Sequence, residues 1–344
     1  MLIQKETLFT SIIKRFTGAF AAVFGFLLAI VCIGLILAST KMGSSVDADL
    51  LVMKVHPIDG LIAKPFKPKK PVILQINIEG EIGKGNITSN YIQKILSQPQ
   101  AYNFLDGQVK GVLLRINSPG GSASECSEIY ADLLSYKETH NLPIHTWIGD
   151  MCASGGVYLS SASDYITAQT LSVIGSVGVR SKPNFNFYEW MQYHGISQTT
   201  ITAGKNKIHL PMFSKMPPGT SSYDDLIAVI DYIYENFLDV VVKARGSHGL
   251  TKEKLINIGA SVYSPIKAKE LGFIDEANVR YTQAVMHLAK SLELDDYQVI
   301  SFEEPERYID GWKKSFESKF SFLFKNTSKE LPFSLEADFS DPSA

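Results

Sequence analysis

Hydrophobic residues along this chain follow two spacings that alternate with each other. Runs that are apolar throughout, or at every second position, predict strands over residues 72–82, 109–117, 143–150, 164–169 and 273–275. Helical spacing, or a run of small residues in 151–163, predicts helices over residues 122–138, 151–163, 222–245 and 264–272. Strands that alternate with helices in this way are typical of an α/β fold with a mainly parallel sheet.

The most apolar segment lies near the N-terminus. Residues 18–38 carry no charged side chain. A helix rises 1.5 Å per residue, so about 20 residues span the roughly 30 Å hydrocarbon core of a bilayer. We therefore expect residues 18–38 to form a retained transmembrane anchor. A cleaved signal peptide is the alternative, although its apolar core is usually only about 7–15 residues long.

The charges around this segment give its expected orientation. Lys5, Lys14 and Arg15 precede it, and their excess over the basic residues that follow is slight. Basic residues favour the cytoplasmic side, while long domains cross the membrane largely regardless of charge. We expect a single-pass protein of the cell (inner) membrane, with residues 1–17 in the cytoplasm and the folded bulk of the chain outside it.

The rest of the chain divides by composition. Residues 39–70 are rich in proline, lysine and small polar residues, which predicts a linker. The periodic sequence of 71–290 predicts the main folded domain. Residues 291–326 form a C-terminal extension, in which 307–324 are amphipathic and predict a helix docked on its own domain, on a partner subunit or on the membrane surface. The polar tail 327–344 is expected to be disordered.

Composition narrows the functions that are open to the folded part. The formal net charge is −2, and no basic stripe with interleaved aromatic residues is present, so we expect no nucleic-acid partner. The 7 histidines are scattered without a metal-binding motif, which predicts no metal site. Three cysteines, Cys32, Cys126 and Cys152, are an odd number at spacings that predict no disulfide framework.

Ser154 is the first candidate for chemistry. It stands in the sequence Cys-Ala-Ser-Gly-Gly, after a predicted strand and at the start of a helical run. Unpaired N–H groups and the positive end of the helix dipole favour negative charge on a serine at such a position. The flanking glycines let a substrate backbone approach closely. A serine that merely caps a helix is the alternative, because serine is a preferred N-cap residue.

Two further segments would complete a catalytic site. The sequence Asn-Ser-Pro-Gly-Gly at 117–121 lies at another strand-to-helix turn, and its glycine N–H groups would form either an oxyanion hole or a simple structural turn. Lys205 and Lys207 lie in Thr-Ala-Gly-Lys-Asn-Lys. A lysine acts as a general base only when it is neutral, which burial favours by lowering its pKa, and Ser–Lys pairs are a known variant of the catalytic triad. Two solvated loop lysines are the alternative.

Taken together, these segments resemble the signal peptide peptidase A family of serine peptidases, the protease IV group, in its half-length form. The ordered motifs of that family are matched at 117–121, 153–158, 175–178 and 204–207, and the segment 262–276 is similar to the family's closing motif. The resemblance covers about residues 70–280.

The resemblance implies a fold, an assembly and roles for individual residues. The fold is the crotonase-like one shared with Clp protease, made of stacked βαβ units that assemble into homo-oligomeric rings. Ser154 is implied as the nucleophile, Lys207 rather than Lys205 as the general base, and Ser176 as the residue that orients the lysine. Signal peptides or other membrane-associated peptides are the implied substrates, no cofactor is required, and the lysine of half-length relatives serves the serine of a neighbouring subunit.

The expected reaction is acyl transfer. Neutral Lys207 removes the proton of Ser154, which attacks the peptide carbonyl, while backbone N–H groups near Gly120, Gly121 and Gly155 hold the oxyanion. Lys207 then protonates the leaving amine, and water completes the hydrolysis.

Three alternatives stay open from the sequence. Cys152 and Val157 depart from the family pattern beside the nucleophile, and a Cys152 nucleophile would need a histidine or cation that no motif supplies. An acyl-CoA hydratase or isomerase shares the implied fold, but the membrane segment and the lack of an evident carboxylate pair argue against it. An inactive membrane scaffold is the third, and intact Ser154 and Lys207 argue against that.

Overall fold

A computed structural model describes residues 51–58, 65–201, 203–204, 212–215 and 221–305, together with residues 16–18, 20, 24–26 and 28–29. The chain divides into two units, Met1–Leu50 and Leu51–Ala344. The described residues of the first unit are helical. Within the described parts of the chain, no helix has both the length and the apolar character needed to cross a bilayer. Most of the expected anchor at 18–38 lies outside the described residues.

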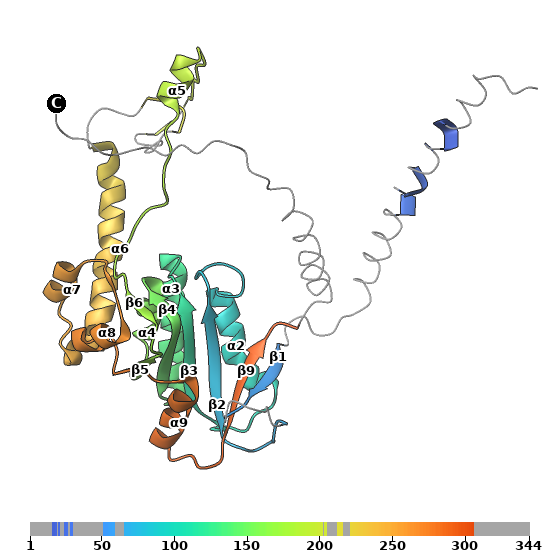
Figure 1. Ribbon diagram of the computed structural model, residues 1–344, viewed down its shortest axis with the longest axis vertical. Coiled ribbons are helices and arrows are strands. Elements are labelled where there is room, and N and C mark those ends of the chain that lie inside the picture. The colour runs from blue at the N-terminus through green and yellow to red at the C-terminus, as the bar shows by residue number, and fades with distance from the viewer. Residues whose placement is uncertain are drawn as a thin grey trace, which may run out of the picture. The chain divides into compact units, whose positions relative to one another are not determined.

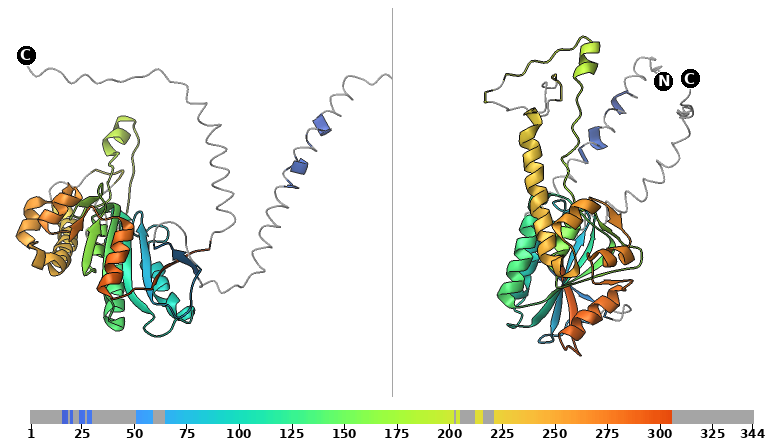
Figure 2. Two further views of the ribbon diagram at one scale, coloured as in Figure 1. Left: turned by 60° about the horizontal axis from the view of Figure 1, so that its bottom comes forward. Right: turned by 90° about the vertical axis from the view of Figure 1, so that its left-hand side faces the viewer.

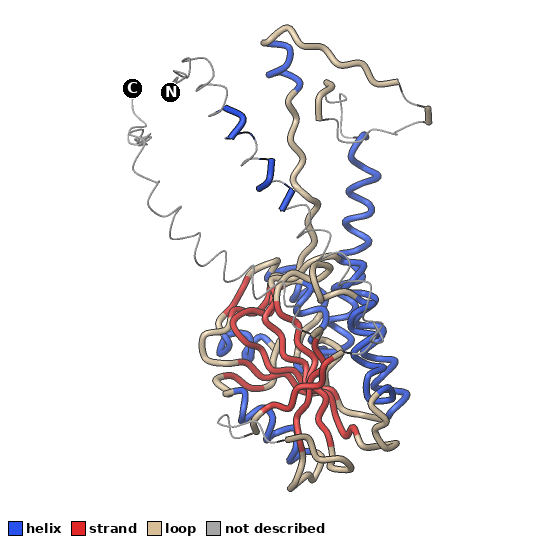
Figure 3. Tube along the Cα trace, turned by 90° about the vertical axis from the view of Figure 1, so that its right-hand side faces the viewer, coloured by secondary structure: helices blue, strands red, loops and turns tan. Residues whose placement is uncertain are grey.

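The second unit is an α/β fold around one central sheet (Figure 1). Its strands are β1 (Val52–His56), β2 (Val72–Glu79), β3 (Val109–Ser118), β4 (Ile144–Ala153), β5 (Tyr165–Ala168), β6 (Val173–Gly175), β7 (Val262–Tyr263), β8 (Glu276–Ala277) and β9 (Gln298–Glu303). The main path runs β1-β9-β2-β3-β4-β5-β8, and β6 joins β4 to β7. Only β1 and β7 are antiparallel to their described neighbours. Figure 3 shows the strands fanning out, as the twist of a sheet requires.

Helices cover both faces of this sheet (Figure 2). They are α2 (Ser89–Ala101), α3 (Ala123–His140), α4 (Gly155–Ser160), α5 (Tyr188–Tyr193), α6 (Ser221–Arg245), α7 (Lys252–Ile258), α8 (Pro265–Leu271) and α9 (Tyr281–Ser291), with a short 3₁₀ helix, η1 (Gly246–His248). Successive strand residues point to opposite faces. Leu74 and Ile76 therefore join the larger core, which includes buried residues of α2, α3 and α4, while Ile73 and Leu113 pack with α9 in a second core.

The central elements follow the predicted pattern. Strands β2 and β3 coincide with the apolar runs at 72–82 and 109–117, and α3 coincides with the helix predicted over 122–138. The side chains of Cys126 and Leu133 are buried on the predicted inner face of α3. The long helix predicted over 222–245 is present as α6. The α/β prediction is thus confirmed.

Two segments at the ends of the folded unit differ from the prediction. The sequence predicted a linker over 39–70 and an extension over 291–326, yet β1 lies in the first and β9 in the second. Val52 pairs with Glu303 in an antiparallel ladder, and β9 also pairs with β2. Each strand exists because of a partner far away in sequence, which local periodicity does not reveal. The amphipathic segment 307–324 and the tail 327–344 lie outside the described residues.

A buried ion pair joins the C-terminal end of α6 to the sheet. Arg245 donates two hydrogen bonds to Asp275, each 3.0 Å long, and a third to the Gly272 carbonyl at 2.8 Å. Asp275 also accepts the Ile166 N–H at 2.7 Å from β5 and lies 2.9 Å from His248 Nε2. The residues predicted as a strand at 273–275 thus form this junction, and β8 follows at Glu276.

Candidate active site

A bend in β4 brings the chain to Ser154. The first part of β4 pairs with β5, whereas its last three residues pair with β6. On the β3 side, Ile116 lies opposite Ile148 and Ser118 lies opposite Cys152, so β4 contains two more residues than β3 over this interval. Extra residues of this kind bend a strand and re-aim its end. The strand therefore continues to Ala153, past the predicted end at 150, and the helix α4 begins only after Ser154.

The side chain of Asn117 holds this bend in place. Its Oδ1 accepts the backbone N–H of Met151 at 3.2 Å, and its Nδ2 donates to Asp150 at 3.3 Å. Gln169, which follows β5, donates to the other carboxylate oxygen of Asp150 at 2.7 Å. The first residue of the Asn-Ser-Pro-Gly-Gly segment thus supports the strand that carries the candidate nucleophile.

Ser154 occupies a strained turn between β4 and α4. Its backbone has φ +51° and ψ −116°, a region that non-glycine residues rarely adopt. Its N–H donates to the Gly175 carbonyl at 2.9 Å, and its own carbonyl accepts the N–H groups of Val157 and Tyr158. The Oγ lies 3.5 Å from the Gly178 carbonyl, at the limit of a hydrogen bond. The backbone is thus fixed while the hydroxyl, on a partly exposed residue, is only weakly engaged.

The glycine turn after β3 packs directly against Ser154. A Cβ on Gly120 would lie 2.8 Å from both the Gly155 nitrogen and the Ser154 Cβ, and a Cβ on Gly155 would lie 2.5 Å from the Cys126 Sγ. Gly120 also has φ +101°, which disfavours any side chain. Only glycine fits at both positions, so two of the predicted oxyanion residues lie side by side with the candidate nucleophile.

Ser176 lies on the opposite side of Ser154. It directly follows Gly175, whose carbonyl accepts the Ser154 N–H, and it has φ +56°. Its N–H donates to the Ser261 carbonyl at 2.7 Å. The structure thus brings together the segments 117–121, 153–155 and 175–178. Lys205 and Lys207 lie outside the described residues.

The described residues between β6 and α5 leave the sheet. None of the described residues from 178 to 201 is buried. Figure 1 shows α5 within an extended excursion beyond the sheet. Its large apolar side chains face solvent: Phe185, Trp190 and Tyr193 are 64%, 58% and 87% exposed. An apolar arm of this kind is typical of a surface that another molecule covers.

The two cysteines near the turn have no nucleophilic character. Cys152 is fully buried and Cys126 is 2% exposed, and both thiols are free. Burial raises the pKa of each to about 12. Because the thiolate is the reactive form of cysteine, these thiols are inert at neutral pH.

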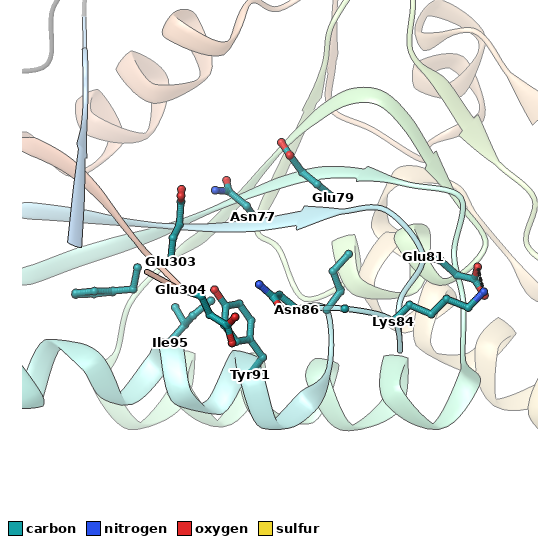
Figure 4. A pocket seen from close by; sticks show the side chains of 12 residues that line it. Asn77, Glu79, Glu81, Lys84, Asn86, Tyr91, Ile95, Glu303 and Glu304 are labelled. Atoms are coloured by element: carbon teal, nitrogen blue, oxygen red, sulfur yellow. Dashed lines mark ion pairs between the residues drawn. The ribbon is translucent and has the colours of Figure 1, made fainter. Parts of the chain in front are cut away.

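A separate cavity is lined in part by the loop that follows β2. It has a volume of about 680 Å³ and opens between the end of β2, the start of α2 and the end of β9 (Figure 4). Its lining includes the acidic side chains of Glu79, Glu81, Glu303 and Glu304. Neither Ser154 nor Ser176, the described candidate catalytic side chains, lines it. Among the described residues, no group of three or more histidine, cysteine or acidic side chains is arranged to hold a metal ion.

Comparison with known proteins identifies the family. Residues 137–295 match the pattern of peptidase family S49. The chain is 30% identical over 277 residues to an Enterococcus faecium protein named "Putative signal peptide peptidase SppA", and the match covers 76% of each chain. The chain belongs to peptidase family S49. It is therefore a serine peptidase, and the resemblance stated from the motifs is confirmed.

Other S49 relatives differ in length from this chain. "Protease 4" of Haemophilus influenzae is 28% identical over 251 residues, which are 69% of this chain but 38% of that protein. "Serine protease SPPA, chloroplastic" of Arabidopsis thaliana is 30% identical over 123 residues, 36% of this chain and 17% of that protein. The S49 match includes the segments of Ser154, Ser176 and Lys207 but begins after the glycine turn at 117–121.

Sequence reasoning missed three groups that shape the site. Ser118 lies inside a motif that was singled out, but its hydroxyl was given no role. Ile82 exchanges backbone hydrogen bonds with Gly120 and Ser122, and nothing in the local sequence signals this. The Ser261 carbonyl, which holds Ser176, comes from a segment far along the chain.

Proposed function

We propose that this S49 peptidase is a membrane-anchored endopeptidase in which Ser154 is the nucleophile and Lys207 the general base. The observation that carries the proposal is the turn at Ser154. A strained backbone presents a weakly bonded hydroxyl directly against two glycines whose backbone is packed too closely for any side chain. Strain of this kind is maintained where the surrounding structure over-determines it, which is typical of catalytic sites.

The backbone around Ser154 is suited to acyl transfer. As Ser154 attacks the peptide carbonyl, the oxygen becomes an anion that needs N–H donors. The N–H groups of Gly155 and Gly121 have no acceptor among the described residues. Gly155 directly follows the nucleophile, and Gly121 directly follows Gly120, which packs against it. Gly120 packs closely against Ser154 and Gly155 and so holds the glycine turn beside the nucleophile. The acyl-enzyme is then hydrolysed by water, with Lys207 returning the proton to the leaving amine.

The general base and its orientation rest on the family motif. Lys207 ends the Gly-x-x-Lys sequence that begins at Gly204, and Ser176 lies in Gly-Ser-Val-Gly beside the nucleophile. Ser176 orients the lysine by a hydrogen bond. The described residues that follow β6, up to α5, extend away from the sheet, which supports a base that reaches the Ser154 of a neighbouring subunit in a homo-oligomeric ring.

The remaining features follow from the same reading. The parallel βαβ units favour the crotonase/Clp-like arrangement as the finer description of the fold. Residues 18–38 anchor the chain in the inner membrane, with the N-terminus in the cytoplasm and the catalytic domain outside. Signal peptides or other membrane-associated peptides are the substrates.

Family membership argues against the hydratase and scaffold alternatives, and the buried Cys152 thiol argues against a cysteine nucleophile.

One expression experiment tests the proposal. Peptide-hydrolysing activity of the full chain should sediment with the membrane fraction and be released by detergent but not by salt. Ser154→Ala should abolish this activity, because no other hydroxyl takes its place in the turn. Cys152→Ala is the matched control two residues away and should keep most of it. Retained activity in Ser154→Ala would exclude the nucleophile, and activity in the soluble fraction would exclude the anchor.

A further inference from the structure

A buried hydroxyl lies beneath the glycine turn of the active site. Ser118 is the last residue of β3, and its side chain is fully buried. Its Oγ donates to the Gly80 carbonyl at 2.6 Å and accepts the Gly120 N–H at 3.1 Å. The hydroxyl therefore uses both of its hydrogen-bonding roles to tie the end of β2 to the glycine turn.

Backbone bonds to Ile82 determine the direction of the next peptide group. The Gly120 carbonyl accepts the Ile82 N–H, and the Ile82 carbonyl accepts the Ser122 N–H, each at 2.9 Å. In a planar trans peptide the N–H points opposite to the carbonyl. The Gly121 N–H, which shares a peptide group with the Gly120 carbonyl, therefore points away from Ile82. Since Ser118 already engages the N–H of Gly120, the N–H of Gly121 is the donor that this turn leaves for a substrate.

Apart from the two bonds to Ile82, the turn has few means of holding this geometry. Gly120, at φ +101°, has no side chain to limit its conformations, and Pro119 has no N–H to donate. Gly120 is buried whereas Gly121 is exposed. A rotation about the backbone of Gly120 would redirect the N–H groups on either side of it. The hydroxyl of Ser118 opposes that rotation by engaging the buried N–H.

We propose that Ser118 is a positioning residue of the peptidase reaction: its buried hydroxyl fixes the glycine turn so that the Gly121 N–H, together with that of Gly155, donates to the oxyanion. This inference rests on the proposed function, in which Ser154 is the nucleophile. Ser118 itself touches neither substrate nor the reacting atoms.

The proposal predicts a defect in the transition state rather than in substrate binding. Removal of one oxyanion donor typically lowers kcat by about 10²–10³-fold. A donor that is misdirected rather than removed should cost less, so Ser118→Ala should lower kcat by roughly 10–100-fold while KM changes by less than about threefold. A peptide aldehyde forms a tetrahedral adduct with the serine, so its affinity should fall by the same factor as kcat/KM.

Ser163→Ala is the matched control. Ser163 is also a buried serine, and its hydroxyl bonds the Thr146 hydroxyl at 2.6 Å. Thr146 lies near the start of β4, at the opposite end of the strand from Ser154. This variant should lower the melting temperature comparably but leave kcat, KM and aldehyde affinity unchanged. Should Ser118→Ala fail to fold, Ser118→Cys replaces the hydroxyl with a slightly larger thiol that is a weaker donor and acceptor, and its kcat should fall with KM unchanged.

The measurements separate this inference from the proposed function. The kinetic constants and the aldehyde affinity are measured on the full chain in detergent, and the melting temperature is recorded for every variant. A fall in kcat and aldehyde affinity in the Ser118 variants, absent from Ser163→Ala, supports the inference. Wild-type kcat in a folded Ser118 variant, a change in KM alone, or an equal loss in Ser163→Ala overturns it. Failure of the proposed function has a different signature, namely full activity in Ser154→Ala.

Discussion

At the scale of single residues, the sharpest question is which lysine acts as the base. Lys205 and Lys207 are the same residue type two positions apart, so each is the control for the other. Lys207→Ala should lower kcat by about 10²–10⁴-fold, the usual contribution of a general base, whereas Lys205→Ala should change it little. Steady-state kinetics on a peptide substrate measures both. An equal loss in the two variants would contradict the assignment.

The sequence predicts which segments carry chemistry but not the role of each atom in them. Gly120 and Gly121 are equivalent as letters in a motif. Only the hydrogen bonds to Ser118 and Ile82 distinguish a glycine whose N–H is engaged in the interior from one whose N–H is available. The strain at Ser154 likewise becomes visible only in the backbone angles. The order of the motifs predicted that these segments come together. Hydrogen bonds between distant segments determine which N–H group is available.

At the scale of elements, the junction of α6 with the sheet depends on one buried ion pair. The Arg245 and Asp275 side chains are 3% and 9% exposed. Asp275→Ala leaves the Arg245 charge buried and unpaired, which typically costs about 3–5 kcal/mol. The variant should therefore melt at least about 6 °C lower, since 1 kcal/mol corresponds to roughly 2–4 °C in a domain of this size.

The control for that prediction is an exposed pair on α8. The Lys267 and Glu270 side chains are 54% and 58% exposed, and an ion pair of that kind is worth about 0–1 kcal/mol. Glu270→Ala should leave the melting temperature almost unchanged. Thermal unfolding of the full chain in detergent, followed by circular dichroism, compares the two. Equal shifts would show that the buried pair has no special role at the end of α6.

Elements with strong local periodicity were predictable, and those made by distant pairing were not. The runs that became β2, β3 and α3 are long and self-consistent, so period and apolar content were enough. Strand β1 has five residues and lies in a proline- and lysine-rich stretch, and it exists only because β9 pairs with it. The end of β4 was placed too early because the extra residues in its bend, including Gly149 and Asp150, resemble a turn in the sequence.

At the scale of the whole molecule, the proposed ring would complete the described site. The sheet positions Ser154, Ser176 and the glycine turn with close packing, whereas the described residues 178–201 include no buried residue and expose large aromatic side chains. Burial of an apolar surface of this kind is the usual driving force for association. The proposed nucleophile Ser154 and the proposed base Lys207 would meet if the apolar segment of one subunit packs on the sheet of the next.

A mixing experiment tests this arrangement quantitatively. Ser154→Ala and Lys207→Ala subunits should each be inactive alone, but co-expressed in equal amounts they assemble at random into a closed head-to-tail ring. A site works when a Lys207→Ala subunit supplies Ser154 and its neighbour, a Ser154→Ala subunit, supplies Lys207. Each choice has a probability of one half, so about one quarter of wild-type activity should return. If both residues belonged to one chain, no mixed site would contain both, and activity would stay at zero. Differently tagged subunits that purify together but remain inactive would overturn the shared site and leave the pairing of Ser154 with Lys207 intact.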